Sequence, residues 1–257
     1  MNIGFLGTGK ISSALVEAIC TSSLKDYRIF LSPRNKEKSI ALEAKFTRVT
    51  RMKSNKDVLN ESDIVFVALK PDVYLNILSG LEYRSDHIIV SLIPYTSYGI
   101  LRNLCKPAKS ITRAIPLPAV ITHNCPIPVF SPDDRVLQIF SEIGNPIIVE
   151  DENQLHALWA LTGLITPYYD MLSELSKWAS ENGVKKSIAN KYVADMFSAL
   201  SLMAGNMDNP DFNALSDHAA TPGGMNEAAG KALKSAGTHQ DYTKEAERIF
   251  MNFKKPV

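Results

Sequence analysis

The chain has 257 residues, of which 45% are hydrophobic, and its 28 basic and 27 acidic side chains leave a formal charge of +1. This composition excludes a disordered chain and suffices for one large or two smaller domains. The balanced charge provides no bulk attraction to nucleic acid or to an anionic membrane surface. We therefore expect the partners to be small molecules or a second copy of the chain.

The cysteines and the first residues predict a cytoplasmic protein. Cys20, Cys105 and Cys125 lie far apart and lack metal-ligand spacing, so we expect free thiols in a reducing compartment. Met1-Asn2 offers no basic region of a signal peptide, and no run approaches the roughly 18 apolar residues of a membrane span. The five histidines are scattered, so no metal site is predicted.

Short apolar runs alternate with helical patterns in the first half of the chain. The predicted strands are separated by enough residues for a crossover helix, and they are residues 2–6, 28–31, 63–68 and 88–92. This alternation predicts a parallel sheet with helices on both faces. Three shorter runs, whose prolines favour edge positions, extend the predicted sheet at residues 110–112, 127–130 and 147–149.

Helical periodicity replaces the strands after Glu150. Two apolar stripes share the spacing of one helix face, the first through Leu155, Leu158, Trp159, Thr162 and Ile165 and the second through Val193, Met196, Phe197, Leu200 and Met203. We place the boundary between Val149 and Asn153. The prediction is therefore an α/β domain over residues 1–150 and an all-helical domain over residues 151–257.

The first strand runs directly into Gly7-Thr8-Gly9, and a helical pattern follows. This context is the one that a dinucleotide-binding fingerprint requires, because glycines allow the tight turn and the close approach of a pyrophosphate at the helix N-terminus. Ser12 replaces the third glycine and is small enough for helix and strand to stay close. We assign cofactor binding to the turn and the start of the helix, namely Gly7, Gly9, Lys10, Ile11 and Ser12, in a doubly wound, Rossmann-type sheet.

The residues after the second strand indicate which dinucleotide binds. An enzyme that selects NAD commonly carries a carboxylate there, whereas this chain has Ser32-Pro33-Arg34-Asn35. Arg34 is suited to a charged fork on a 2′-phosphate, with Ser32 and Asn35 as further donors. The sequence therefore predicts NADP, and the alternative is an ordinary solvated basic loop.

Four segments in the same order resemble the pyrroline-5-carboxylate reductase family nearly from end to end. They are the opening Ile3–Gly9, Ala68-Leu69-Lys70-Pro71 beside the family's A-V-K-P, Arg113-Ala114-Ile115-Pro116 beside R-x-M-P, and Thr221-Pro222-Gly223-Gly224 beside S-P-G-G. The resemblance implies NADPH-dependent reduction of a cyclic imine carboxylate to proline. It also implies a homodimer through the helical domain, with the substrate site completed across subunits.

The chemistry gives these segments separate tasks. Ala68, Lys70 and Pro71 follow a buried strand, at the sheet edge where cofactors bind. Successive amides at Gly223 and Gly224, before a helical pattern, suit a substrate carboxylate. We therefore expect substrate binding at Thr221, Gly223, Gly224 and Met225, and catalytic roles at Asn226 and Tyr169.

Departures from the family pattern cluster around the substrate. Met225-Asn226 stands where the family has a threonine that contacts the imine ring, although an asparagine still donates a hydrogen bond. The more apolar run 162–169 represents the family's S-G-S-G-P-A-Y, so Tyr169 matches its tyrosine and either donates a proton or packs within the helix. Ser91–Tyr95 stands where the family has an Ala-Gly pair near the nicotinamide. We expect either the proline precursor or a bulkier relative as substrate.

Two other functions fit parts of the sequence. A beta-hydroxyacid dehydrogenase-like reductase would share the first domain but needs a general acid or base, typically a lysine, on the first long helix of the second domain. This chain has none there before Lys177. A non-catalytic NADP-binding protein needs only the first domain, and turnover of any imine would exclude it.

Overall fold

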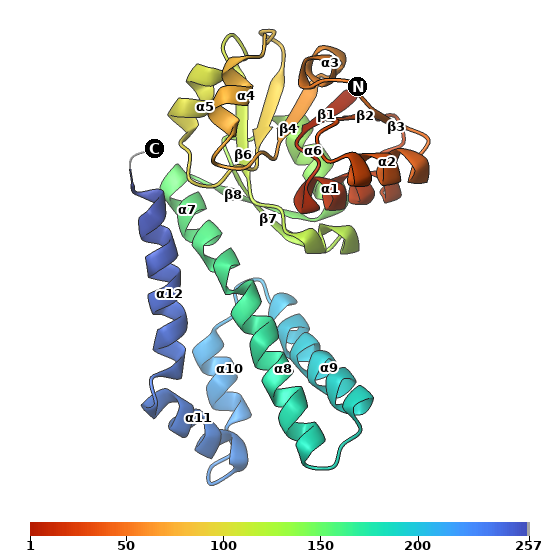
Figure 1. Cartoon of the computed structure of the whole chain (residues 1–257). Coiled ribbons are helices and arrows are strands. Elements are labelled where there is room, and N and C mark those ends of the chain that lie inside the picture. Colours follow the sequence, from red (N-terminus) through yellow and green to blue (C-terminus); the bar gives the residue numbers. More distant parts are fainter. Residues whose placement is uncertain (256–257) are drawn as a thin grey trace. The chain divides into compact units, whose positions relative to one another are not determined.

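The computed structural model describes residues 1–255, and its described strands form one eight-stranded sheet in the order β3-β2-β1-β4-β5-β6-β7-β8 (Figure 1). The strands are β1 (Asn2–Leu6), β2 (Arg28–Leu31), β3 (Val49–Arg51), β4 (Ile64–Val67), β5 (Ile88–Ser91), β6 (Ser110–Ala114), β7 (Pro126–Phe130) and β8 (Asn145–Val149). All neighbours pair in parallel except β6 and β7, so β7 and β8 run against the others. The predicted Rossmann-type sheet is confirmed.

Helices cover both faces of this sheet because successive strand residues point to opposite sides. The helices are α1 (Lys10–Thr21), α2 (Lys36–Lys45), α3 (Asn55–Glu61), α4 (Tyr74–Ser79), α5 (Tyr98–Leu104) and α6 (Asp134–Ile143), with a 3-10 turn at Pro118–Thr122. Phe5 and Phe66 stack on the face covered by α1, α2 and α6, where Phe140 meets Phe66 edge-on. Val65 and Val67 face α3, α4 and α5 on the other side.

The prolines of β7 do not place this strand at an edge, and that expectation was wrong. β7 lies between β6 and β8, and the terminal strands of the sheet are β3 and β8. The Pro128 carbonyl accepts a hydrogen bond from Ile115 N, so the ring nitrogen of Pro128 also faces β6. The missing N–H is tolerated because the ladder between β6 and β7 contains only two residue pairs.

The strand register aligns the ends of the central strands. Leu6 pairs with Val67, Val67 with Ser91, and Ser91 with Arg113. The loops that follow β1, β4, β5 and β6 therefore leave the sheet side by side at its carboxyl edge, where doubly wound proteins bind ligands.

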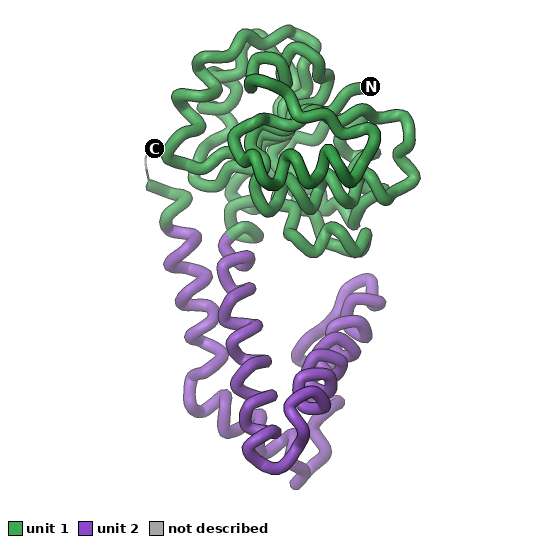
Figure 2. Tube along the Cα trace, turned by 45° about the vertical axis from the view of Figure 1, so that its right-hand side comes forward, with its two compact units in different colours: residues 1–159, 252–257 green, residues 160–251 purple. Residues whose placement is uncertain are grey.

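The chain divides into two compact units, and the division falls within α7 (Glu152–Leu161) (Figure 2). The first unit comprises Met1–Trp159 and the described residues from Asn252 onward, and the second comprises Ala160–Met251. This division lies after the boundary expected at residue 150, because Leu155 of α7 is fully buried against Ile115 and Val149. The start of α7 therefore packs with the sheet.

The second unit is helical, as predicted. Its helices follow a 3-10 turn at Thr162–Leu164 and are α8 (Ile165–Glu181), α9 (Lys186–Gly205), α10 (Phe212–Ala219), α11 (Met225–Ser235) and α12 (Thr238–Phe253), whose last residues belong to the first unit. Helices α8 and α9 pack as a hairpin. Among the described residues of these five helices, only Ser176, Ala189 and Val193 are buried.

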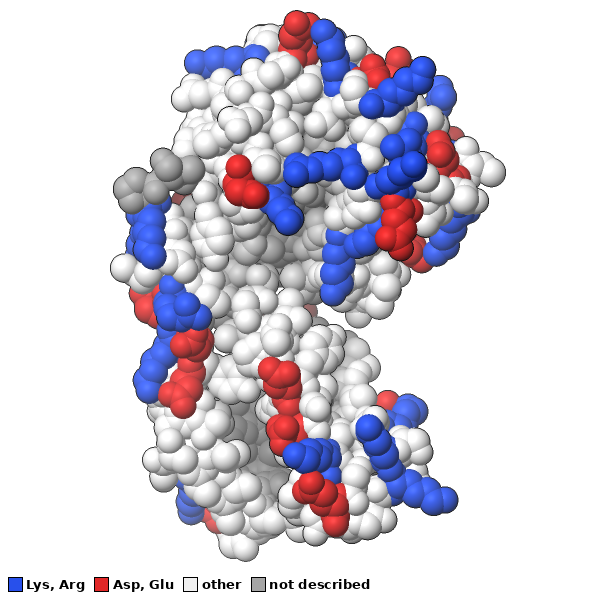
Figure 3. All heavy atoms as spheres, in the orientation of Figure 1, with Lys and Arg blue, Asp and Glu red and all other residues white. Residues whose placement is uncertain are grey.

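The surface carries charges of both signs. Basic and acidic side chains are interspersed over the sheet unit in Figure 3, whereas much of the helical unit is uncharged in that view. No helix within residues 1–255 has the length and apolar character needed to cross a membrane.

Candidate functional site

A cavity of about 380 Å³ opens at the carboxyl edge of the sheet, where the loops after β1, β2 and β4 meet. Apart from Leu69, its lining consists of small, polar and basic residues: Gly7, Thr8, Gly9, Arg34, Asn35, Lys36, Ala68 and Lys70. Six of these were predicted as cofactor ligands from the sequence. The cavity does not include the other predicted ligands, which are Lys10, Ile11, Ser12, Ser32 and Pro71.

The glycine turn has two glycines with different requirements. Gly7 has φ +95°, and a Cβ atom there would meet the Ala68 carbonyl oxygen at 2.5 Å, so the fold itself needs glycine. A Cβ atom on Gly9 would meet no chain atom within 4 Å and would extend into open space. A residue that the fold leaves unconstrained, on the wall of a cavity and directly before a helix, suits the close approach of a pyrophosphate.

Ser12 and Ser32 stabilise the turn from behind. The buried Ser12 hydroxyl donates to the Gly7 carbonyl oxygen at 2.6 Å. Ser32, which is 1% exposed, accepts a hydrogen bond from Gly7 N at 2.9 Å, and its carbonyl oxygen accepts one from the Thr8 hydroxyl at 3.0 Å. In this arrangement Ser32 fixes the turn and is not an open donor.

Basic side chains surround the loop after β2. Arg34 is exposed and makes no hydrogen bond or ion pair to the described residues, so its guanidinium is available to an anion. Asn35 caps α2 by accepting from Lys38 N at 3.3 Å. Arg51 donates to the Pro33 carbonyl oxygen at 3.3 Å and holds this loop. Lys36 adds a second cation that the sequence analysis missed, although its position beside Arg34 was a usable signal.

The remaining predicted ligands lie around the turn. Lys10 is exposed at the first position of α1, and Ile11 packs against the core. Lys70 is exposed, and its carbonyl oxygen accepts from Val73 N and Tyr74 N at 3.2 Å. Pro71 is exposed immediately after it.

A charged cluster is buried near the end of β6. Arg113 is fully buried and donates to Glu152 Oε1 at 2.5 Å, to His156 Nε2 at 2.9 Å and to the Ile93 carbonyl oxygen at 3.0 Å. Glu152 Oε1 also accepts from Tyr98 N at 2.6 Å. One arginine thus connects the start of α7 with the loop after β5.

Burial governs the protonation of this cluster. Burial, and then the positive charge of Arg113, lower the pKa of His156 below its ordinary value, while Glu152 opposes this effect. A neutral His156 can accept the hydrogen bond from the guanidinium, whereas a protonated one cannot. Burial also lowers the pKa of Arg113, and the charge of Glu152 counteracts it.

The predicted substrate-binding segment lies in the helical unit, before α11. Gly223 has φ +73°, and its N–H donates to Glu227 Oε2 at 2.8 Å, while Gly224 N donates to the Thr221 carbonyl oxygen at 2.8 Å. Lys231 donates to the other Glu227 oxygen at 2.6 Å, and these two hydrogen bonds lower the pKa of Glu227. Both glycine amides expected to hold a substrate carboxylate are therefore occupied by the chain itself.

The two predicted catalytic residues are exposed in the single chain. Asn226 donates from Nδ2 to the Ala219 carbonyl oxygen at 3.1 Å, which leaves its second amide hydrogen and its oxygen available. Tyr169 is 63% exposed, and its ring contacts Tyr168. Met225 is 86% exposed. Glu227 was missed, although an acidic residue in the first turn of a helix is a recognisable capping signal.

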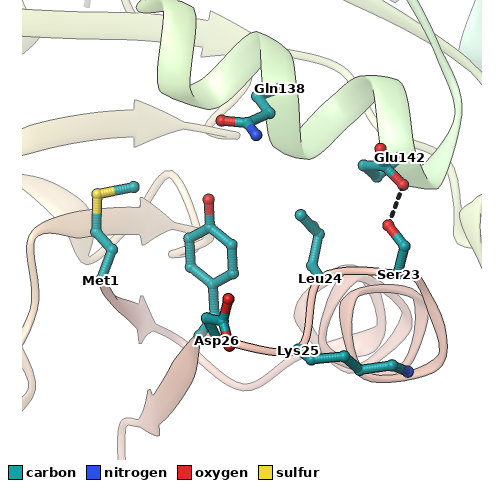
Figure 4. A pocket seen from close by; sticks show the side chains of 8 residues that line it. Met1, Ser23, Leu24, Lys25, Asp26, Gln138 and Glu142 are labelled. Atoms are coloured by element: carbon teal, nitrogen blue, oxygen red, sulfur yellow. Dashed lines mark hydrogen bonds between the residues drawn. The ribbon is translucent and has the colours of Figure 1, made fainter.

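A second cavity, of about 370 Å³, lies at the opposite edge of the sheet (Figure 4). Its lining comes from the chain start, the loop before β2, and α6: Met1, Ser23, Leu24, Lys25, Asp26, Tyr27, Gln138 and Glu142. Ser23 donates a hydrogen bond to Glu142 across it. It contains none of the predicted site residues, and the described chain holds no cluster of three or more potential metal-ligating side chains.

Two family models cover most of the sequence. Residues 2–95 match the family described as NADP oxidoreductase coenzyme F420-dependent, and residues 152–254 match pyrroline-5-carboxylate reductase dimerisation. The chain is 25% identical to the pyrroline-5-carboxylate reductase of Escherichia coli K12, over 91% of this chain and 90% of that protein. It is 26% identical to pyrroline-5-carboxylate reductase 2 of Rattus norvegicus, over 92% of this chain and 78% of that protein.

The chain belongs to the pyrroline-5-carboxylate reductase family. Its fold agrees with this assignment. A pyrroline carboxylate reductase structure from Plasmodium falciparum, with NADP bound, superposes with a TM-score of 0.84 at 20% identity, over 99% of this chain and 97% of that one.

Two of the family segments acquire structural explanations. The arginine of the family's R-x-M-P segment is the buried Arg113 that holds Glu152 and the Ile93 carbonyl oxygen. Tyr95 ends the segment Ser91–Tyr95, which stands where the family has an Ala-Gly pair, and it has φ +55°. A left-handed backbone favours glycine, so Tyr95 holds a bulky side chain in an uncommon conformation.

We expect His156 to make stability depend on pH. Because its pKa is lower in the folded protein, the unfolded chain protonates first, and stability is lost as the pH falls from about 6.5 toward the folded-state value. His87, whose pKa burial also lowers, contributes in the same direction. His156→Gln removes a titrating group but keeps an acceptor for Arg113.

The measurement is the urea-unfolding free energy between neutral and mildly acidic pH. His156→Gln should reduce its slope against pH by about half, because each shifted group contributes up to about 1.4 kcal/mol per pH unit. His239→Gln, at an exposed histidine of α12, is the matched control for the substitution itself. An unaltered slope in His156→Gln would contradict the role of His156.

Proposed function

We propose that this protein is an NADPH-dependent reductase of a cyclic imine carboxylate, pyrroline-5-carboxylate or a close analogue. The observation that carries the proposal is the cavity between the glycine turn and the unpaired Arg34, in a chain whose curated relatives are pyrroline-5-carboxylate reductases. Gly9 leaves room for a pyrophosphate there, and Arg34 offers a guanidinium to a 2′-phosphate. NADPH, when bound, supplies the hydride for the C=N bond.

The chain's own residues bind and orient the cofactor. The amides at the start of α1 face the phosphates, and Ser12 and Ser32 keep the Gly7 turn in shape from inside the fold. Arg34 and Asn35 contact the adenosine end, with Lys36 as a further cation. Ala68 and Lys70 bound the cavity on the β4 side. We also keep Lys10, Ile11 and Pro71 as proposed contacts at the rim.

The helical unit presents the imine. An iminium nitrogen already carries its proton, so reduction adds a hydride to carbon and needs no general acid. The second amide hydrogen of Asn226 and the Tyr169 hydroxyl are the proposed donors that orient this nitrogen or protonate a neutral imine. A ketone reductase, by contrast, needs a general acid or base, typically a lysine on this helix. The only lysine of α8, Lys177, lies near the end of the helix.

The substrate carboxylate has to compete with Glu227. We propose that it binds in the segment Thr221, Gly223, Gly224 and Met225, where the first-turn amides of α11 supply donors and a favourable helix dipole. Glu227 occupies the Gly223 amide in the single chain. This contact favours two alternatives, a substrate other than pyrroline-5-carboxylate and an NADP-binding protein without turnover.

We propose a homodimer through the helical unit, in the cytoplasm. Several large apolar side chains on α8 and α9 are exposed, among them Leu175, Trp178, Ile188, Tyr192, Leu200 and Met203. Exposed large apolar side chains are typical of a protein interface, and the matched family model describes dimerisation. The three free cysteines, two of them buried, support a reducing compartment.

When pyrroline-5-carboxylate is added, the purified protein should oxidise NADPH. The reaction is measured as the loss of NADPH absorbance. Gly9→Ala is the matched control: it should fold normally but lower kcat/KM by about tenfold or more, because its methyl group enters the phosphate site. Gly7→Ala should lose stability as well. NADPH binding without turnover of any cyclic imine would contradict the reductase and support the non-catalytic reading.

Arg34→Gln should weaken NADPH binding by about ten- to a hundredfold, the loss of one charge-assisted fork, and change NADH binding by less than about threefold. Titration with both cofactors measures this. Arg28→Gln removes the same charge from an exposed residue at the other end of β2 and should change neither. Equal losses for NADPH and NADH would show that Arg34 does not read the 2′-phosphate.

Trp178→Glu should convert the dimer into monomers in sedimentation velocity, because it places a charge in an apolar interface. Asn103→Glu, with the same added charge at an exposed residue of α5, should leave the assembly unchanged. A Trp178→Glu dimer of unaltered stability would exclude this helix face as the interface.

A further inference from the structure

The loop after β5 is the next neighbour of the cofactor cavity. Strands β1, β4 and β5 are adjacent, and Val67 pairs with Ser91, so residues 92–96 leave the sheet beside the Ala68–Lys70 loop. Arg34 and the glycine turn account for the adenosine and phosphate end. The nicotinamide half of a dinucleotide then extends toward β4 and β5. This placement rests on the proposed function.

Tyr95 in this loop has an unfavourable backbone conformation. Its φ of +55° is uncommon for a residue with a bulky side chain, and such a conformation persists only when surrounding contacts impose it. The loop is anchored on both sides of Tyr95. Ile93 accepts from Arg113 at 3.0 Å, and the hydroxyls of Tyr74 and Thr96 are hydrogen bonded at 3.0 Å.

Phe253 supplies the contact at Tyr95 itself. Its ring centroid lies 4.6 Å from that of Tyr95, 4.7 Å from that of His156 and 5.8 Å from that of Trp159. The His156 contact is a parallel stack, with 20° between the rings. His156 accepts a hydrogen bond from Arg113, and the Arg113 guanidinium lies 5.3 Å from the Trp159 ring centroid. Phe253 therefore links the strained tyrosine to the buried arginine cluster.

We propose that Phe253 is a positioning residue for the nicotinamide side of the site. It acts through Tyr95: the aromatic contact holds the left-handed backbone, and the backbone sets the loop of residues 92–96 against the reactive end of the cofactor. The last turn of α12, more than a hundred residues from the loop in the sequence, thus belongs to the active-site support.

Hydrogen exchange, measured without cofactor or substrate, tests whether Phe253 holds the loop of residues 92–96. Phe253→Ala should accelerate amide exchange in the segment 92–97 by about tenfold, as expected for loss of a local tertiary contact, while β1 and β4 keep their protection. Met251→Ala removes a large, 47% exposed side chain from the same turn and is the matched control. Unchanged exchange in Phe253→Ala, or equal acceleration in both variants, overturns the proposal.

Kinetic and binding measurements with NADPH test whether the position of this loop affects catalysis. Phe253→Ala should lower kcat by about ten- to a hundredfold, because small misplacements of the reacting groups cost that much, while the NADPH dissociation constant changes by less than about threefold. Phe253→Tyr should restore kcat. A weakened NADPH affinity with unchanged kcat, or faster loop exchange with unchanged kcat, overturns the positioning role.

A double-mutant cycle identifies Tyr95 as the intermediary. Glycine adopts the left-handed backbone without strain and carries no ring, so Phe253→Ala should have little effect on loop exchange in a Tyr95→Gly background. Additive effects would overturn the assignment to Tyr95. If the wild-type protein binds NADPH but turns over no imine, the proposed function fails, and nicotinamide fluorescence replaces kcat: an identical spectrum in Phe253→Ala overturns the inference.

Discussion

The backbone of Gly7 approaches the Ala68 carbonyl so closely that a single methyl group would not fit between them. This contact joins the loop after β1 to the loop after β4, and Ser32 adds the loop after β2 through its hydrogen bond with Gly7 N. Three loops from three strands thereby form one wall. The cavity depends on this wall, because its glycine, basic and β4 residues come from these separate segments.

A second constraint lies farther along the same sheet edge. Burying Arg113 removes a guanidinium from water, a cost that hydrogen bonds from its terminal nitrogens offset. Glu152, His156 and the Ile93 carbonyl oxygen accept these hydrogen bonds, whereas Nε has no partner among the described residues, and the acceptors come from α7 and the loop after β5. The arginine therefore fixes the start of the helical half against the sheet, which explains why the compact division falls inside α7.

The sequence was informative where a feature is local. The strands, the glycine turn and the basic loop could be predicted because alternation, φ preference and charge are properties of neighbouring residues. It was less informative where partners are distant: Arg113 meets Glu152 and His156 across 39 and 43 residues. Ser32 illustrates the limit, since only the tertiary structure shows that its hydroxyl faces the Gly7 amide.

Other differences also depend on tertiary pairing. β7 runs antiparallel to β6 and pairs with it at only two residues, a tertiary pairing that no local pattern encodes. Glu227, by contrast, lies four residues after Gly223 and is a first-turn acid, so its contact with the Gly223 amide was accessible to sequence reasoning. Because Glu227 accepts from the Gly223 amide, the glycine motif by itself does not describe the substrate end.

The sparse interior of the helical unit has a thermodynamic consequence. Within the described residues of α8 to α12, only Ser176, Ala189 and Val193 are buried, so one copy gains little from removing apolar surface from water. Covering the exposed apolar side chains, as in the proposed dimer, would supply the burial that one copy lacks. For a self-associating chain this makes folding a bimolecular equilibrium, in which the melting temperature rises with protein concentration and dilution alone loosens the helices.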